Sequence, residues 1–216
     1  MGDVLSEQLG GVPVGIVSVG WGGTRIDQWD PDNVDTTQVG WDTAAFQPGT
    51  STLYGRLAYA IQELDGEFAG ILWHQGESDY GKSTDYYAAS LEELIEASRD
   101  FADWEVPWSI ALVSYDPTQN PTTDADIIAA QLQVIEEMDG VLLGPDSDAL
   151  LGEFRGTNGN NIHFSVLGLQ TLGALWAQSA GQMSALVPEP ATYLMLLLGT
   201  LFLGFVRYRK RHAQSV

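Results

Sequence analysis

FAGILWHQGESD, residues 68–79, joins a short apolar run to a dense group of polar residues. Its first half is a short apolar run, which predicts a buried strand. Its second half places imidazole, carboxamide, carboxylate and hydroxyl groups where that strand ends. Polar groups at the end of a buried strand cost desolvation unless they are paired. Ligands of open parallel α/β sheets bind at the carboxyl ends of the strands, so the stretch predicts an enzyme-like site there.

Three more runs of similar character predict further buried strands, because they are short, almost continuously apolar and bounded by Gly or Pro. These runs cover residues 12–20, 106–115 and 140–146. Helical periodicity separates the runs, at residues 53–64, 84–104, 124–138 and 166–183. Alternation of strands and helices predicts an α/β fold with a three-layer, doubly wound parallel sheet.

Charge is distributed very unevenly along the 216 residues, whose formal net charge is −20. Four of the nine basic residues lie in one cluster at residues 207–211, whereas all 29 acidic residues lie at or before Glu189. An acidic body repels phosphate backbones, which argues against nucleic acid as a partner and leaves neutral, sugar-like ligands compatible. The chain has no Cys, which excludes thiol catalysis and Cys-ligated metal sites.

The C-terminal region predicts a transmembrane helix. Residues 191–206 carry no charge and are followed at once by the basic cluster at 207–211. As a helix they span about 24 Å, a little less than a bilayer core, and the flanking basic residues favour membrane insertion. An ordinary single-pass tail anchor is one interpretation of this segment.

The sequence VPEPATYLMLLLGTLFLGFVRYRKR, residues 187–211, resembles a PEP-CTERM sorting signal. A Pro-Glu-Pro triplet at 188–190, a hydrophobic helix at 191–206 and a basic tail at 207–211 are all present. The resemblance assigns residues 184–211 to a sorting segment. It implies export in a Gram-negative, exopolysaccharide-producing bacterium, anchoring in the inner membrane, processing by an exosortase, and then a location at the cell surface or in the extracellular matrix.

The N-terminal residues MGDVLSEQLGG, 1–11, have neither the basic nor the apolar region of a signal peptide. They are typical of the end of an amphipathic helix that stops at Gly10–Gly11. For an exported protein this predicts that an N-terminal segment is missing from the sequence.

Two stretches could stabilise a developing negative charge. The glycines of SVGWGGTRIDQW, residues 18–29, allow backbone N–H groups to face a ligand, although a tight structural turn explains them equally well. In WHQGESD, the Gln75 carboxamide can donate to an oxyanion, while Glu77 and Asp79 either orient neighbouring groups or solvate the start of the next helix. For His74 we favour a packed histidine at a strand end over a catalytic group.

A third stretch, GNNIHFSVLG at residues 159–168, precedes the last predicted helix. His163 is either a general base or a structural loop residue, and Asn160 could orient its imidazole. No nucleophile is evident: there is no GxSxG elbow, and neither Ser18 nor Ser78 follows a strand beside a base. No metal and no cofactor are predicted.

Taken together, five blocks resemble an SGNH-type hydrolase of the sialate O-acetylesterase/acetylxylan esterase branch. The blocks are GGT…W at 22–29, LYGRL at 53–57, WHQGESD at 73–79, GPDSDAL at 144–150 and IHFSVLG at 162–168. The resemblance covers residues 3–183, and we place an esterase domain at residues 1–183. It implies an oxyanion hole formed by Gly22 or Gly23 with Gln75, and His163 as the general base.

Two family features are absent from the chain. The family nucleophile is a serine on a turn after the first strand, which is central in a 2-1-3-4-5 (flavodoxin-like) strand order; that block is not present, and residues 12–20 correspond to the second strand. The family also usually has Asp where Asn160 stands, and loss of a triad carboxylate costs orders of magnitude in rate.

The leading hypothesis is an exported carbohydrate O-acyl esterase, a serine hydrolase that is incomplete as given, whose partners are an acylated polysaccharide, an exosortase and, through the C-terminal helix, the membrane. The alternative is a non-catalytic, polysaccharide-binding or matrix-associated surface protein derived from a hydrolase. A third possibility is a gene remnant that does not fold stably, because loss of a central strand exposes unpaired edges.

Overall fold

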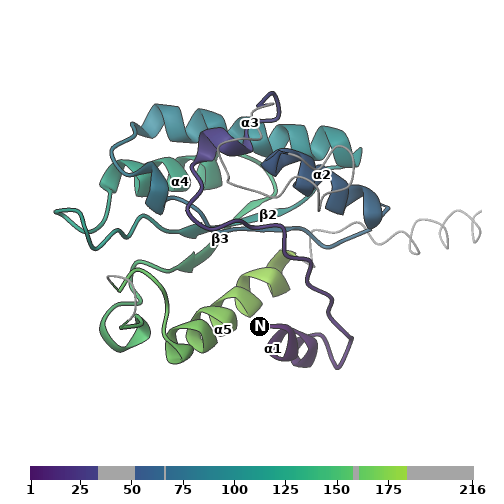
Figure 1. Ribbon diagram of the computed structural model, residues 1–216. Helices are drawn as coiled ribbons and strands as arrows, with labels where there is room; N and C mark the ends of the chain where they lie inside the picture. The colour runs from purple at the N-terminus through teal and green to yellow at the C-terminus, as the bar shows by residue number, and fades with distance from the viewer. Residues whose placement is uncertain (34–51, 66, 158–160, 184–216) are drawn as a thin grey trace, which may run out of the picture. The chain divides into compact units, whose positions relative to one another are not determined.

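The computed structural model describes residues 1–33, 52–65, 67–157 and 161–183. This part of the chain is an α/β domain in which a parallel sheet of three strands, in the order β1–β2–β3, has helices on both faces (Figure 1). The strands are β1 (Ile71–Trp73), β2 (Trp108–Leu112) and β3 (Val141–Asp146). The α-helices are α1 (Gly2–Gln8), α2 (Leu53–Glu63), α3 (Thr84–Ala102), α4 (Ala125–Glu137) and α5 (Val166–Met183), and three short 3₁₀ helices are η1 (Ile26–Trp29), η4 (Glu77–Asp79) and η5 (Gly152–Phe154).

The register of the sheet brings the carboxyl ends of its strands together. Trp108 of β2 pairs with Ile71 of β1 on one side and with Val141 of β3 on the other, and both pairings are parallel. Each strand therefore ends at the same edge of the sheet, and the polar stretches that follow β1 and β3 start from that edge.

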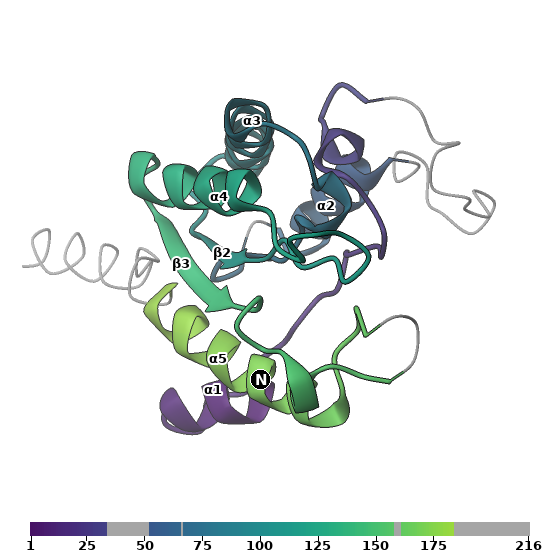
Figure 2. The same ribbon diagram turned by 90° about the vertical axis from the view of Figure 1, so that its left-hand side faces the viewer.

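Both faces of the sheet are covered. Helices α2, α3 and α4 lie on one face and α1 and α5 on the other (Figures 1 and 2). Trp108 and Ile110 of β2 belong to the core beneath α3 and α4, whereas Ala111 and Val113 belong to the core beneath α5. This double burial explains why the strands are almost continuously apolar in sequence.

The predicted helices are confirmed, and polar caps define where three of them start. The side chains of Thr52, Ser83 and Asp124 accept hydrogen bonds from backbone N–H groups in the first turns of α2, α3 and α4. Such caps satisfy N–H groups that have no partner within the helix. Strands were also expected at three of the observed places, and they are shorter than the apolar runs that contain them.

The N-terminal residues form a helix, as the sequence predicts, and this helix packs along α5. Met1 lies against Gly173 and Gln8 against Gly181, so α1 and α5 run in parallel. The two glycines leave room for this close approach, because a Cβ on Gly173 would lie 3.2 Å from the Met1 nitrogen.

The strand predicted at residues 12–20 does not form in this structure. This run has no strand partner, and Val12, Ile16 and Val17 are 55%, 57% and 58% exposed. An apolar run becomes a strand only when a neighbour satisfies its N–H and C=O groups, and the part of the chain that the structure describes offers none beside this run. It therefore extends from α1 to η1 without joining the sheet.

Three predictions fall on residues that the structure does not describe: Asn160, the transmembrane helix at 191–206, and the sorting segment at 184–211. Among the described helices, none combines the length and apolarity that crossing a membrane requires.

Gly76 gives a test of how closely the strand ends approach one another. A Cβ on Gly76 would lie 2.0 Å from the Val113 carbonyl oxygen, which is backbone and cannot move aside cheaply. We expect Gly76→Ala to lower the free energy of unfolding of the full-length gene product by about 1–3 kcal/mol, measured by urea denaturation. Gly2→Ala is the matched control, because its Cβ would meet only a side-chain carbon at 3.8 Å. Equal stability of the two variants would contradict this packing.

Candidate active site at the strand ends

The Gln75 side chain lies at the centre of a buried hydrogen-bond network just after β1. Its Nε2 donates to the Thr24 carbonyl oxygen at 2.9 Å and to Asp79 Oδ2 at 2.6 Å. Asp79 Oδ2 also accepts from the Ile26 backbone N–H at 2.8 Å. These bonds fasten the glycine-containing loop before η1 to the end of β1, so the structure brings together two stretches that are about fifty residues apart in sequence.

Two helices complete this network from above the sheet. The Tyr87 hydroxyl of α3 donates to the Gln75 backbone oxygen at 2.6 Å and lies 2.9 Å from Gln75 Oε1. Gln131 of α4 donates to the Gln75 and Val113 carbonyl oxygens at 3.2 and 2.9 Å and accepts from the Val113 N–H at 3.0 Å. Burial raises the pKa of Tyr87, so its hydroxyl stays protonated and can keep donating.

Gly22 and Gly23 lie in an exposed turn that Thr24 closes. Thr24 Oγ1 donates to the Trp21 carbonyl oxygen at 2.9 Å, and Trp29 Nε1 donates to Thr24 Oγ1 at 3.1 Å. Gly23 has φ +73°, a left-handed conformation that favours glycine. Within the described ranges the N–H groups of Gly22 and Gly23 have no hydrogen-bond acceptor, in contrast to the Gln75 amide, whose two protons are both engaged.

Asp79 is the acceptor of this network, and it is 1% exposed. Burial raises the pKa of its carboxyl, and the hydrogen bonds from Gln75 and Ile26 only partly offset this effect. Its second oxygen, Oδ1, is buried without a hydrogen-bond partner among the residues described. A charged oxygen without a donor is costly in a dry environment, which is the physical cause of the raised value.

His74 packs beneath the loop that carries His163. Its ring meets the Phe164 ring edge to face, with the centroids 6.2 Å apart. Burial lowers the pKa of His74 more than the nearby Glu77 carboxylate raises it, so its neutral form is favoured. This packing brings the stretch around residue 163 next to the end of β1.

His163 itself is exposed on a loop that the backbone holds firmly. Gly156 N–H donates to the His163 carbonyl oxygen at 2.7 Å, and Ser165 N–H donates to the Phe154 oxygen at 2.8 Å. Its imidazole makes no hydrogen bond to any described residue. An exposed imidazole at a strand-end edge is free to face a ligand, which is what a general base requires.

Serines near this edge have structural partners. The Ser114 hydroxyl donates to Asp148 Oδ2 at 2.7 Å and accepts from the Asp124 N–H at 2.8 Å. Ser147 donates to the Leu112 oxygen and Ser165 to the Glu153 oxygen. Among the described residues, no serine hydroxyl is hydrogen-bonded to an imidazole, and no group of His, Asp and Glu side chains could hold a metal ion.

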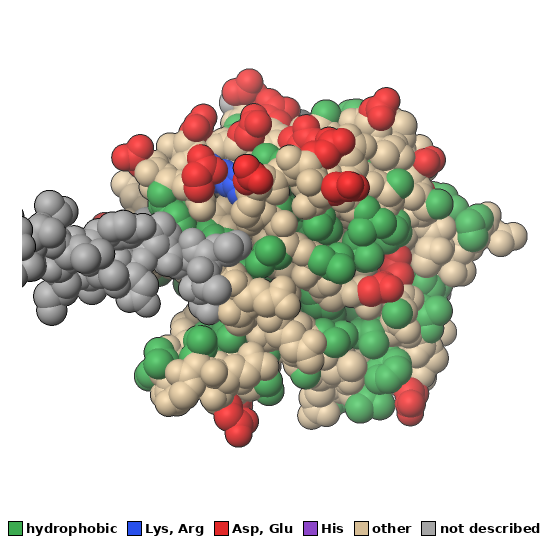
Figure 3. All heavy atoms as spheres, turned by 180° about the vertical axis from the view of Figure 1, so that it is seen from behind, with side chains coloured by type: hydrophobic (Ala, Val, Ile, Leu, Met, Phe, Trp, Pro, Cys, Tyr) green, Lys and Arg blue, Asp and Glu red, His purple; other side chains and the backbone are tan. Residues whose placement is uncertain are grey.

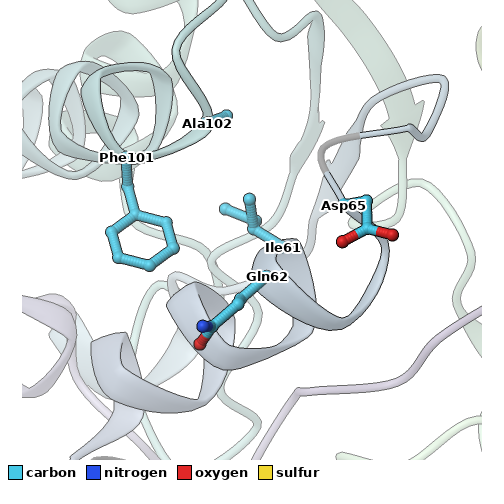
Figure 4. Close-up of a pocket in the computed structure, with 5 residues that line it drawn as sticks. All are labelled: Ile61, Gln62, Asp65, Phe101 and Ala102. Atoms are coloured by element: carbon cyan, nitrogen blue, oxygen red, sulfur yellow. The ribbon is translucent and has the colours of Figure 1, made fainter.

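A hollow of about 320 Å³ lies elsewhere on the domain, between the last turns of α2 and α3 (Figure 4). Its lining is Ile61, Gln62, Asp65, Phe101 and Ala102. Helix α3 starts beside the strand-end site and ends at this hollow, so about 28 Å of helix separates the two. With one carboxylate and no imidazole, the hollow lacks the groups for acid–base chemistry.

The surface above the sheet is acidic. Figure 3 shows acidic side chains gathered over the upper part of one face. Exposed acids on α3 and α4 include Asp85, Glu93, Glu96, Asp126 and Glu136. A surface of this sign disfavours polyanionic ligands, and neutral ligands are compatible with it.

The structure therefore brings together the glycine loop, Gln75, Asp79 and the His163 loop, which the sequence had singled out. Glu77 lies close enough to His74 to raise its pKa electrostatically. The sequence did not single out Arg155, Tyr87, Gln131 or Asp148, which hold these parts in place. The one signal for Arg155 is its rarity, because only five basic residues precede the C-terminal cluster.

Comparison with known families finds a match for the domain and another for the C-terminal region. A family model described as carbohydrate esterase, sialic acid-specific acetylesterase, matches residues 2–182. The chain belongs to this family, which confirms the resemblance noted in its sequence. A PEP-CTERM protein-sorting motif matches residues 186–211, which implies export in a bacterium.

The curated relatives match this chain over only a small part of their own length. A protein named sialate O-acetylesterase from Pongo abelii is 26% identical over 95 residues, which is 41% of this chain and 18% of the relative. The protein of the same name from Homo sapiens is 25% identical over 95 residues, with the same coverage. The chain thus spans less than a fifth of the length of these relatives. No solved structure matches.

Asp79 predicts a specific dependence of stability on pH. Since its folded-state pKa is raised, the folded protein binds more protons than the unfolded chain between the ordinary Asp value, about 3.9, and the raised value. Stability is therefore lost as the pH rises through this window. Asp79→Asn retains an acceptor but cannot ionise, so its unfolding free energy relative to the native protein should increase from pH 4 to pH 7.

Urea denaturation at several pH values measures this difference. Asp139→Asn, which removes a carboxylate at an exposed position, is the control. A difference for Asp79→Asn that stays flat or decreases as the pH rises would show that the carboxyl does not titrate as its burial requires.

Proposed function

We propose that this protein is an exported carbohydrate O-acyl esterase, which removes acetyl groups from a polysaccharide at the strand-end site. The observation that supports this most is the meeting of the glycine loop, the Gln75 network and the His163 loop at one edge of the sheet. Family membership supports an acylated carbohydrate as substrate, and the sorting motif supports processing by an exosortase. Inner-membrane anchoring through 191–206, followed by release to the cell surface or matrix, belongs to the same proposal.

In this proposal a serine hydroxyl attacks the ester carbonyl while His163 takes its proton. The negative charge on the carbonyl oxygen is stabilised by N–H groups of Gly22 and Gly23, and Gln75 exchanges one of its two bonds for this oxygen. The imidazolium then gives this proton to the departing sugar oxygen as the ester bond breaks, which leaves an acyl-serine and a free sugar hydroxyl. Water then attacks the acyl-serine while His163 takes a proton from it. The imidazolium returns this proton to the serine oxygen, which releases the carboxylic acid and restores the serine.

We infer that the nucleophile lies on a strand outside residues 1–216, which would fill the sheet between residues 12–20 and β1. The exposure of Ile16 and Val17 supports this inference, because apolar side chains of a buried strand need cover on both faces. The outer edge of β1, which has no described partner, supports it as well.

The exposed side of α5 supports a helix that leads from such a strand into α1. Val166 and Leu169 are 74% and 59% exposed, and they lie seven and four residues before Gly173, on the side that α1 covers. Because α1 and α5 run in parallel, two further turns before Gly2 would cover both side chains. A strand–helix unit is thus the segment for which the domain leaves room.

A non-catalytic surface protein that binds polysaccharide is the second candidate. It is favoured by Asn160, which stands where the family usually has Asp, and by the absence of a serine bonded to an imidazole within the described ranges. Binding of acetylated polysaccharide without release of acetate would decide for this candidate.

Acetate release from acetylated xylan by the full-length gene product tests the esterase proposal. We expect His163→Ala to lower kcat/KM by about 10²–10⁴-fold, because the serine loses its general base. Thr157→Ala, at an exposed position on the same loop, should leave the rate unchanged. Activity that survives His163→Ala would remove His163 from its assigned role.

Alanine substitutions at Ile16 and Val17 test the missing strand. If the run joins a completed sheet, Ile16→Ala should lower the unfolding free energy by about 2–5 kcal/mol. At the exposure it has in this structure, the same change should cost less than about 0.5 kcal/mol. Leu132→Ala on α4, 44% exposed, is the control. Costs as small as that of the control, for both Ile16→Ala and Val17→Ala, would contradict the insertion of a strand.

A further inference from the structure

Arg155 is a buried cation at the centre of the loops that follow the strands. Arg155 is only 7% exposed, and its guanidinium donates to three backbone carbonyl oxygens. Nε donates to the Leu150 oxygen at 2.7 Å, Nη1 to the Ile162 oxygen at 2.8 Å and Nη2 to the Ser147 oxygen at 2.8 Å. Each nitrogen of the planar fork thus holds a different point of the backbone.

Two aromatic rings add to this hold. The guanidinium carbon lies 4.5 Å from the centre of the Tyr115 ring and 4.1 Å from that of the Phe164 ring. Cation–π contacts are stronger when the guanidinium is desolvated. Tyr115 follows β2 and Phe164 follows His163, so Arg155 links the end of the sheet to the loop of the proposed base.

These contacts lie on both sides of His163 along the chain. The carbonyl of Ile162 is hydrogen-bonded to Arg155, and the ring of Phe164 lies against the same guanidinium. The Phe164 ring also has a second contact that holds it, because the His74 ring meets it edge to face. His163 itself has an exposed imidazole, so its direction depends on how firmly its two neighbours are held.

The Arg155 clamp, which is the guanidinium with its three carbonyl acceptors and two rings, is also anchored to the loop that follows β2. The Asp148 carboxylate accepts from the backbone N–H groups of Ser114 and Tyr115 at 2.9–3.1 Å and from the Ser114 hydroxyl at 2.7 Å. Asp148 lies between Ser147 and Leu150, whose carbonyls accept from Arg155. The loop after β3 is therefore held to β2 by a carboxylate and to the His163 loop by a guanidinium.

A buried arginine could also serve stability alone, and Arg99 provides that comparison. Arg99 is 9% exposed and donates to the Val106 and Asp139 carbonyl oxygens at 3.1 and 2.8 Å. It ties loops at the opposite edge of the sheet, where the strands start. Arg99 also pairs with the Glu105 carboxylate at 3.4 Å. The two arginines have similar burial and both donate to backbone carbonyls, but only Arg155 contacts the residues on either side of His163.

We propose that Arg155 is a positioning residue, whose guanidinium fixes the backbone and the ring on either side of His163 and so directs the imidazole toward the reacting ester. This inference rests on the proposed function, because it assumes that His163 is the base. Lysine cannot replace arginine here, since an ammonium lacks both the planar fork and the flat face that lies between the two rings.

The experiment compares Arg155→Lys with Arg99→Lys in the full-length gene product. With acetylated xylan as substrate, we expect Arg155→Lys to lower kcat at least tenfold and to leave KM within about twofold, because base positioning acts on the chemical step. Arg99→Lys should lower the melting temperature about as much as Arg155→Lys does, and it should leave kcat unchanged. Guanidinium chloride at non-denaturing millimolar concentration should partly restore kcat in Arg155→Ala.

A second readout does not depend on activity. The imidazole ¹H–¹³C NMR signal of His163, assigned by its loss in His163→Ala, should shift or broaden in Arg155→Lys and stay in place in Arg99→Lys. An equal effect of the two lysine variants on kcat, or a His163 signal that neither variant moves, would overturn the proposal. If the native protein releases no acetate, the esterase proposal fails, and the NMR comparison still decides whether Arg155 positions His163.

Discussion

The parallel alignment of β1, β2 and β3 is the constraint on which the rest of this domain depends, because it delivers three loops to one edge of the sheet. Loops at such an edge carry many polar groups, and these must be paired when they are buried. The Gln75 network pairs them on the β1 side, and the Arg155 clamp pairs them on the β3 side. Among the described residues, the glycine N–H groups and the His163 imidazole are exposed and have no hydrogen-bond partner, so a ligand can use them.

Much of this arrangement could be predicted from sequence because it follows from local rules. Apolar runs bounded by Gly or Pro predicted the three strands, and helical periodicity predicted the helices. The run at residues 12–20 has the same local character but lies outside the sheet, since pairing depends on a neighbour and not on composition. A local pattern indicates that a segment can form a strand, and only the fold decides whether it does.

The candidate site, too, could be predicted from sequence only in part. The motif around Gln75 and the loop around His163 were evident as polar groups at predicted strand ends. Their supports were not, because Tyr87 and Gln131 lie within ordinary amphipathic helices and reach the site only through tertiary packing. Arg155 looks like an isolated surface charge in sequence, and its burial between two rings follows from contacts with residues up to forty positions away.

Covalent labelling distinguishes a serine esterase whose nucleophile lies on a strand outside residues 1–216 from a non-catalytic protein. The full-length gene product would be treated with a fluorophosphonate, which reacts with activated serines, and the modified peptide identified by mass spectrometry. The account predicts one labelled serine, located N-terminal to Met1, and loss of labelling in His163→Ala. A label on a serine within residues 1–183, or no label on a folded protein, would contradict it.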